Sequence, residues 1–270
     1  MNIRYFALSL GVIALASPAF GQPGTGGTIT DANASFTLPD YLDDATGVGA
    51  ENAEFHVGGP GNPNHLFQSG WWYRGVDQGI TRELTLANGS SPSWTGNVGR
   101  TDYVLPDLGT ARQLFVVQGL EDGYGALTQS LIFRNTTSAP ITMDFFHYLD
   151  ADLGGSFGGD SADLIGSNVI RIVDGDWVAS YEGTDTFQVN QYADLLDQLT
   201  DGDADDLDGT GLNFGPGDFT AGFQWRVTIA PGRAVTLTSS LTITLIPAPG
   251  AAVLFGAGML VMASRRNRVM

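Results

Sequence analysis

The residues in this sequence that could do chemistry are carboxylates, and one group of them follows an apolar run directly. Asp150 and Asp152 end that run, and Asp160 and Asp163 come after a glycine-rich stretch. Side chains two residues apart leave the same face of an extended segment, and glycines allow the backbone to fold back. Ca²⁺ takes about six to eight oxygen ligands. The sequence thus supports two interpretations, a Ca²⁺ site formed by these four residues or an acidic strand end whose carboxylates cap turns.

A second acidic group has the beginning of an EF-hand pattern. Asp201, Asp203 and Asp205 match the first three ligand positions of such a loop. Asp206 then stands where the loop requires glycine, and Leu212 stands where it requires a bidentate glutamate. We therefore reject an EF-hand and favour a solvated acidic loop.

The densest aromatic stretch contains Trp71, Trp72 and Tyr73. Aromatic side chains on a strand usually fill a core, where each buries a large area. Displayed beside polar groups, the same three residues could instead stack on sugar rings. Neighbouring residues on a strand point to opposite faces, so Trp71 and Trp72 cannot both enter one face of a core. The core interpretation is favoured, and carbohydrate stacking is the alternative.

Sequence motifs typical of enzymes are absent. The chain has no cysteine, no Gly-x-Ser-x-Gly, no His-Glu-x-x-His and no glycine motif that cradles phosphate. His56, His65 and His147 lack metal-ligand spacing. We therefore expect no catalytic residues and no enzyme. A secreted hydrolase remains as a second alternative, because glycosidase chemistry needs only two positioned carboxyl groups.

The elements that would position these residues are mostly strands. Glycine accounts for 37 of 270 residues, about twice the usual ~7%, which favours turns over helices. Tyr192, Leu195, Leu196 and Leu199 recur with helical spacing, and Asn190 is available as the N-cap. The expected strands cover 34–38, 54–57, 80–86, 112–120, 123–133, 141–149, 167–173, 177–181, 187–189, 219–229 and 234–246. This pattern predicts an all-β protein, a single antiparallel β-sandwich of jelly-roll or Ig-like topology with one short helix.

The N-terminus has the features of a secretory signal peptide. Arg4 precedes an apolar run from residue 5 to residue 16, Pro18 breaks it, and Ala19-Phe20-Gly21 offers small residues for cleavage before Gln22. We expect residues 1–21 to be this signal, 22–33 to be a flexible lead and 34–246 to be the sandwich domain. Export through the Sec pathway follows.

The mature region is strongly acidic. All 29 Asp and Glu fall within residues 22–246 but only 8 of the 12 arginines do, which gives a net charge of 8 − 29 = −21. Such a surface repels phosphate backbones, so we exclude nucleic acid as a partner. It would attract divalent cations. The absence of cysteine means that no disulfide holds the fold.

The C-terminus has three parts. Pro247 and Pro249 come first, residues 250–263 are apolar or glycine, and Arg265, Arg266 and Arg268 follow. Arginine clusters stay on the cytoplasmic side of a membrane. Residues 249–263 number 15, fewer than the about 20 that a stable transmembrane helix needs.

This tail resembles the PEP-CTERM sorting signal of exported Gram-negative proteins, with Ala248 in place of the family's usual glutamate. The resemblance covers residues 247–270 and implies a transmembrane stretch. It also implies an exosortase-type sorting protease as a partner, transient anchoring in the inner membrane, and an association with exopolysaccharide. An ordinary C-terminal membrane anchor is the alternative.

From these features we expect a non-enzymatic protein of the cell surface or extracellular matrix. The alternative is a calcium-assisted carbohydrate-binding module with Trp71, Trp72 and Tyr73 as its stacking residues. Ca²⁺ is the one cofactor that the sequence suggests.

Overall fold

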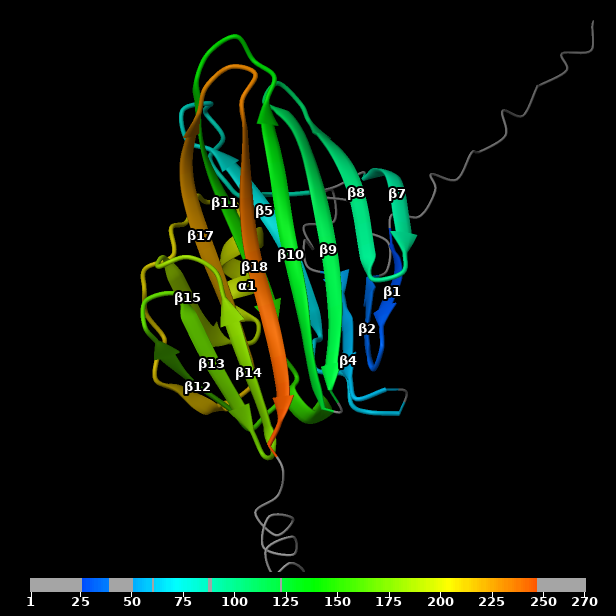
Figure 1. Cartoon of the computed structure of the whole chain (residues 1–270). Helices are drawn as coiled ribbons and strands as arrows, with labels where there is room; N and C mark the ends of the chain where they lie inside the picture. The colour runs from blue at the N-terminus through cyan, green and yellow to red at the C-terminus, as the bar shows by residue number, and fades with distance from the viewer. Residues whose placement is uncertain (1–25, 39–50, 60, 87–88, 122, 247–270) are drawn as a thin grey trace, which may run out of the picture.

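The protein is an antiparallel β-sandwich (Figure 1). The computed structural model describes residues 26–38, 51–59, 61–86, 89–121 and 123–246. The expected signal peptide and the expected sorting signal with its transmembrane stretch lie outside these residues. Among the described residues, no helix combines the length and the apolar character needed to cross a bilayer. The all-β prediction is confirmed.

One layer is a nine-stranded sheet with the order β16-β12-β13-β14-β18-β10-β9-β8-β7. Its long central strands β9, β10 and β18 pair over most of their length (Figure 1). The strands are β7 (Ser90–Thr95), β8 (Val98–Leu105), β9 (Gly109–Glu121), β10 (Tyr124–Asn135), β12 (Asp160–Ile165), β13 (Val169–Asp174), β14 (Trp177–Glu182), β16 (Phe214–Gly217) and β18 (Ala234–Leu245).

The facing layer is a six-stranded sheet with the order β15-β17-β11-β5-β3, in which β6 also pairs with β5. A further sheet has three strands in the order β1-β2-β4. It packs on the nine-stranded sheet, where Phe36 of β2 stacks on Phe115 of β9 with 5.3 Å between ring centroids. The strands are β1 (Gly27–Asp31), β2 (Ala34–Leu38), β3 (Glu51–Asn52), β4 (Glu54–Val57), β5 (Gln68–Gly75), β6 (Leu84–Thr85), β11 (Ile141–Asp150), β15 (Phe187–Gln191) and β17 (Phe219–Ile229).

Several expectations differ from the structure. Residues 27–31, expected within a flexible lead, form β1. Only Leu84–Thr85 of the strand expected over 80–86 pairs, because Glu83 turns inward to an arginine. The strands β7 and β8 were not expected. The inward-facing positions of β8 include Gly99 and Thr101, so its alternation carries little hydrophobic signal.

The two layers differ in how their strands are covered. Along β10 buried and half-buried residues alternate almost throughout, as expected for a sheet with one face on the core. All eight residues of β5 are buried. The reason is the helix α1 (Asp194–Thr200), which lies against the outer face of the six-stranded sheet, where Leu195 and Leu199 pack near Trp72. The sandwich therefore has a third, partial layer on this side.

The helix begins later than its periodicity indicates. Its N-cap is Ala193, which makes no side-chain capping bond. Asn190 was expected in that role but pairs with Thr220 in the ladder between β15 and β17. Tyr192 consequently lies outside the helix.

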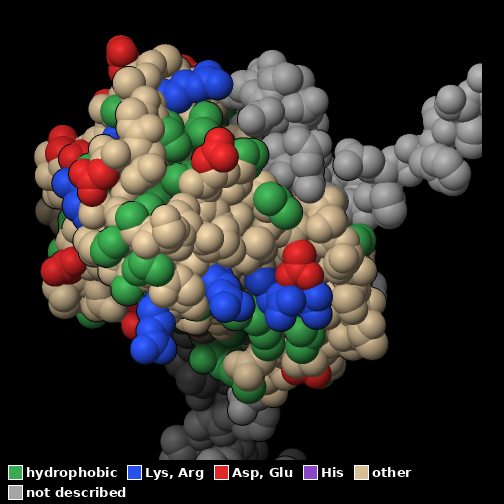
Figure 2. Space-filling view, turned by 90° about the horizontal axis from the view of Figure 1, so that it is seen from above, with side chains coloured by type: hydrophobic (Ala, Val, Ile, Leu, Met, Phe, Trp, Pro, Cys, Tyr) green, Lys and Arg blue, Asp and Glu red, His purple; other side chains and the backbone are tan. Residues whose placement is uncertain are grey.

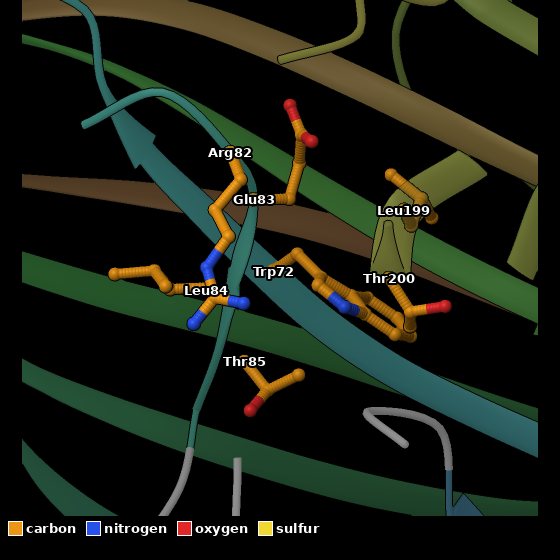
Figure 3. A pocket seen from close by; sticks show the side chains of 7 residues that line it. All are labelled: Trp72, Arg82, Glu83, Leu84, Thr85, Leu199 and Thr200. Atoms are coloured by element: carbon orange, nitrogen blue, oxygen red, sulfur yellow. The ribbon is translucent and has the colours of Figure 1, made fainter. Parts of the chain in front are cut away.

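A small cavity of about 20 Å³ remains under the helix beside Trp72 (Figure 3), large enough for about one water and too small for a sugar.

A buried ion network fastens the loop after α1 to the sheet. Arg74 donates to Glu83 at 2.6 Å and to Asp144 at 2.7 Å, and it also contacts Asp206 of the loop. Arg226 donates to the other oxygen of Asp144 at 2.7 Å. The acidic loop is therefore solvated at its beginning but tethered at Asp206. The opposing charges of this network compensate one another within the fold.

One end of the sandwich carries charged side chains of both signs. Figure 2 shows the end of the sandwich that is uppermost in Figure 1, where basic and acidic side chains are interspersed with apolar ones. Strands β11 and β18 run from this end to the opposite one, where the described chain ends at residue 246 (Figure 1).

Replacing Arg74 should be strongly destabilising. An Arg74→Leu variant leaves Asp144 and Glu83 buried with fewer positive partners, and breaking a buried ion pair costs about 3–5 kcal/mol. Urea unfolding followed by tryptophan fluorescence measures this. The matched control is Arg171→Leu, whose pair with Asp163 is exposed and should cost about 0–1 kcal/mol. Equal losses in the two variants would contradict the assigned role of the network.

Candidate functional site

Three carboxylates meet where β11 ends and β17 begins. Asp150 is the last residue of β11 and pairs with Thr220 of β17. Asp218 precedes Thr220 by two residues, between β16 and β17. Asp152 follows β11 and precedes the short 3₁₀ turn η2 (Leu153–Gly155). The antiparallel register therefore brings Asp218 to residues that are far from it in the sequence.

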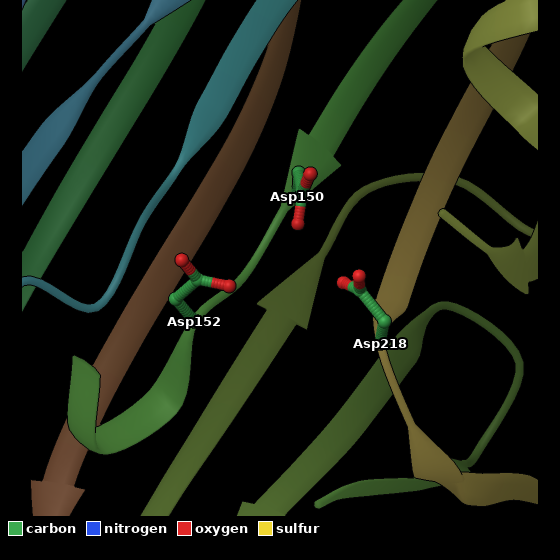
Figure 4. Close-up of side chains that lie close together, drawn as sticks. All are labelled: Asp150, Asp152 and Asp218. Atoms are coloured by element: carbon green, nitrogen blue, oxygen red, sulfur yellow. The ribbon is translucent and has the colours of Figure 1, made fainter. Parts of the chain in front are cut away.

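These three side chains converge (Figure 4). One carboxylate oxygen from each of Asp150, Asp152 and Asp218 can be chosen so that all three lie within 4.8 Å of one another. Asp150 is only 1% exposed, whereas Asp152 and Asp218 are half-buried. Neither carboxylate oxygen of Asp150 has a hydrogen-bond partner among the described residues. Solvent can therefore reach the group at Asp152 and Asp218, whereas Asp150 is shielded from it. We refer to these three residues as the acidic cluster.

The electrostatics of the acidic cluster follow from burial and like charge. Burial raises the pKa of Asp150 to about 8, and the neighbouring charges of Asp152, Asp218 and Asp160 add to the effect. Burial followed by the charge of Asp218 raises the pKa of Asp152, and burial also raises that of Asp218. A carboxylate at this position is therefore costly unless a proton or a cation accompanies it.

Asp160 lies next to the acidic cluster. It pairs with Gly217 in the ladder between β12 and β16, one residue before Asp218, and it is fully buried. Burial raises its pKa to about 8, with further contributions from Asp174, Asp152 and Asp218. The structure thus brings Asp160 near Asp150 and Asp152, while the predicted Ca²⁺ site itself stays a prediction.

Asp163 was predicted in the same site, and this part of the prediction is wrong. Residues three apart on a strand point to opposite faces, so Asp163 lies on the other side of β12 from Asp160. It is exposed and accepts from Arg171 at 2.9 and 3.0 Å. Asp218 takes the place that the prediction gave to Asp163. The sequence signal for Asp218 is its position just before a predicted strand, and it becomes useful only when β17 is known to neighbour β11.

The aromatic run is buried, so its proposed role in sugar stacking is wrong. Trp71 and Trp72 are both 0% exposed, and Tyr73 is buried. Trp71 points between the sheets, where its ring centroid is 5.3 Å from that of Trp225. Trp72 points the other way, under α1, and meets Tyr148 edge-on. The opposite orientations follow from strand alternation, and the helix covers the face that the sequence left open.

Two other aromatic side chains are displayed at the rim of the acidic cluster. Phe67 and Tyr192 are each 39% exposed and contact edge to face, with ring centroids 6.2 Å apart. Their backbone amides donate to the carbonyls of Asp150 and Asp218 at 2.9 and 3.0 Å. The pKa of the Tyr192 hydroxyl is raised by burial and then by Asp150 and Asp218. Sequence reasoning missed this pair because the two residues are 125 positions apart (192 − 67).

A serine and a histidine do approach each other, but inside the core. Ser69 Oγ lies 3.4 Å from His147 Nε2, and the Tyr181 hydroxyl lies 2.7 Å from Nδ1. All three side chains are buried. Burial lowers the pKa of His147 to about 3. A substrate cannot reach this group, so it links the two sheets rather than performing chemistry.

No family model matches the sequence, and no curated protein is significantly similar to it. Solved structures with a similar fold include a polysaccharide lyase, with 11% identity and a TM-score of 0.43 over 80% of this chain and 33% of that one. An Escherichia coli K12 protein assigned as an aldose 1-epimerase has 11% identity and a TM-score of 0.47 over 83% of this chain and 100% of that one. A bacterial glucoamylase complexed with acarbose has 10% identity and a TM-score of 0.39 over 88% and 35%.

These comparisons correct the expectation of a non-enzymatic protein. That expectation rested on missing sequence motifs, whereas the similar solved structures are carbohydrate-active enzymes by name. The chain spans only about a third of the lyase and the glucoamylase. At these identities and TM-scores the likeness assigns no activity to this chain.

Metal-free protein should lose stability as the pH rises from about 6.5 to about 8.5. Asp150 and Asp160 keep their protons in the folded protein up to a pKa of about 8 and release them near 3.8 when unfolded, so the folded state loses its advantage as the pH rises. His147 and His65, with pKa values lowered to about 3 and about 4 by burial, act in the opposite direction, but only below 6.5.

The measurement is the melting temperature in EDTA across this pH range. Asp150→Asn should make the fall shallower, because the asparagine has no proton to release. Asp163→Asn is the control and should leave the slope unchanged, since Asp163 is exposed and paired with Arg171. A wild-type melting temperature that stays level or rises between pH 6.5 and 8.5 would contradict the assigned burial of these carboxyl groups.

Proposed function

We propose that this is an exported carbohydrate-binding protein of the cell surface or extracellular matrix, with its binding site at the acidic cluster. The observation that carries the proposal is the pair of displayed aromatic side chains, Phe67 and Tyr192, beside that cluster. Most other large aromatic side chains of the described chain are buried in the core. A displayed aromatic pair beside convergent polar groups is typical of a ligand site.

The chemistry of this rim suits a sugar. A pyranose ring has an apolar C–H face, which an aromatic ring can cover, and hydroxyl groups, which carboxylate oxygens can accept from. A further displayed aromatic residue is Phe157, which is 78% exposed on the loop between η2 and β12 and follows Asp152 closely in the sequence. No single large pocket is needed, because an extended polysaccharide binds along a surface.

The charge of the protein narrows the choice of glycan. The mature region has a net charge of −21, so it would repel an acidic polysaccharide unless cations intervened. A neutral glycan, or an acidic one bridged by divalent cations, fits this surface. Exopolysaccharide of either type is consistent with the association that the C-terminal signal implies.

Delivery to the surface rests on the two terminal signals. Residues 1–21 would direct export, and residues 247–270 would hold the protein in the inner membrane until an exosortase-type protease processes it. The last described strand, β18, and strand β11, whose last residue is Asp150, both run toward the lower end of the sandwich in Figure 1. The sandwich would thus be attached to the membrane at the end that also carries the proposed site.

Removing the aromatic pair should abolish most of the binding. A Phe67→Ala/Tyr192→Ala variant loses two contacts of about 0.5–1.5 kcal/mol each, which corresponds to a loss of affinity of about 5- to 150-fold. Binding is measured by pull-down on a panel of neutral and acidic polysaccharides, and released reducing ends are assayed in the same tubes to detect turnover. Val104→Ala is the control, since Val104 is an exposed apolar residue on the distant strand β8.

Two outcomes would overturn this assignment. One is that the wild-type protein binds none of the polysaccharides. The other is that the double variant and the Val104→Ala control bind equally well.

Deleting residues 247–270 should change where the protein is found. The truncated protein lacks the proposed sorting signal and should appear in the medium without passing through a membrane-bound form. Fractionation with immunoblotting of cells and medium follows both forms, and an Arg265→Ala/Arg266→Ala/Arg268→Ala variant tests the basic cluster separately. Unchanged surface retention and processing after the deletion would reject the sorting claim.

A further inference from the structure

Two buried carboxylates on β11 differ in what neutralises them. Asp144 and Asp150 lie six residues apart on the same strand, and an even spacing places them on the same face. Asp144 is fully buried and accepts hydrogen bonds from Arg74 and Arg226. Asp150 is almost as buried, yet none of the arginines in the described residues pairs with it, and the neighbouring charges that act on it are other carboxylates. The fold supplies a cation for the first carboxylate and leaves the second without one.

The arrangement around Asp150 matches what a bound calcium ion requires. Two oxygens that ligate one Ca²⁺ lie at most roughly 4.6–5.2 Å apart, because each Ca–O distance is about 2.3–2.6 Å. One carboxylate oxygen from each residue of the acidic cluster can be chosen so that the three lie within 4.8 Å of one another. Every donor is a carboxylate, which suits a hard cation and disfavours metals that prefer nitrogen or sulfur.

An acidic cluster alone does not make a cation site, since exposed carboxylates are common. The independent observation here is that Asp150 is 1% exposed, that neither of its oxygens has a hydrogen-bond partner in the described chain, and that it points into the cluster (Figure 4). Burying such a group without a partner is strongly unfavourable. Asp160, fully buried beside Asp218, adds a further carboxylate at the same place.

We propose that Asp150, Asp152 and Asp218 together bind one Ca²⁺ ion. The ion joins three segments of the chain, the end of β11, the residues before η2 and the beginning of β17. Asp152 and Asp218 are half-buried, so one side of the ion faces solvent and can take water or sugar hydroxyl groups as its remaining ligands. Mg²⁺ fits less well, because it demands near-ideal octahedral geometry and usually keeps several waters.

The contact with sugar rests on the proposed function, whereas the binding of the ion does not. Glycan binding that disappears in EDTA and returns with Ca²⁺ would support both. Stoichiometric Ca²⁺ binding without any glycan binding would remove the proposed function and leave the ion site standing. Glycan binding that EDTA does not change would show that the ion has no part in the contact.

The test of the ion site is calorimetric titration of chelator-treated protein with CaCl₂, together with melting curves. We expect one Ca²⁺ per chain and a melting temperature about 5–10 °C higher at a Ca²⁺ concentration about a hundred times Kd. Asp150→Asn and Asp218→Asn should each lose this binding. Asp163→Asn and Asp201→Asn, which change exposed carboxylates outside the cluster, should keep it.

The stability of Asp150→Asn in EDTA separates loss of a ligand from loss of the fold. At pH 8.5 in EDTA this variant should be at least as stable as the wild type, because the wild-type carboxyl group loses its proton there and becomes a buried charge without a partner, and the variant should not respond to added Ca²⁺. If Asp150→Asn does not fold, Asp152→Asn at a half-buried position gives the same test. No heat and no change in melting temperature for the wild type would overturn the proposal, as would binding that Asp201→Asn abolishes and Asp150→Asn retains.

Discussion

The cost of burying negative charge along β11 is the constraint on which much of this structure depends. A carboxylate removed from water must gain a proton, a cation or several hydrogen bonds. The strand carries two such carboxylates on its outer face. At Asp144 the solution is internal, since Arg74 and Arg226 bind it and also fasten the loop after α1. At Asp150 the fold brings more carboxylates instead, and we propose that a Ca²⁺ ion compensates their charge.

The sandwich makes this possible because both faces of its six-stranded sheet are covered. Trp71 and its neighbours fill the space between the layers, while Trp72 supports α1 on the other side. Covering the outer face removes water from the polar side chains of β5 and β11. The acidic cluster lies where this cover ends, at the beginning of β17, so it combines a buried member with members that solvent can reach.

The sequence predicted the main strands well where alternation and turn residues agree. The expected strands at 34–38, 54–57 and 219–229 have the observed bounds. The sequence did not predict strands whose core-facing positions carry small or polar residues, such as Gly99 and Thr101 of β8. The acidic site was found in part, because Asp150 and Asp152 are close in the sequence. Asp218 was missed, since its place depends on which strand lies beside β11, and strand order leaves no trace in local periodicity.

The aromatic residues show the same limit. Alternation correctly indicates that Trp71 and Trp72 point to opposite faces, but it does not reveal that a helix beginning 122 residues later (194 − 72) covers Trp72. The displayed pair, Phe67 and Tyr192, forms only through the pairing of β5, β11 and β17. Local sequence thus specifies the strands, while the site is a property of how they neighbour one another.

The most direct test of this account is a crystal structure grown with a lanthanide in place of Ca²⁺, with anomalous scattering used to locate the ion. An ion bound as proposed should give a peak within about 2.3–2.6 Å of oxygens from Asp150, Asp152 and Asp218. Crystals with no anomalous peak at these residues, or with the principal peak in the loop at 201–205, would contradict it.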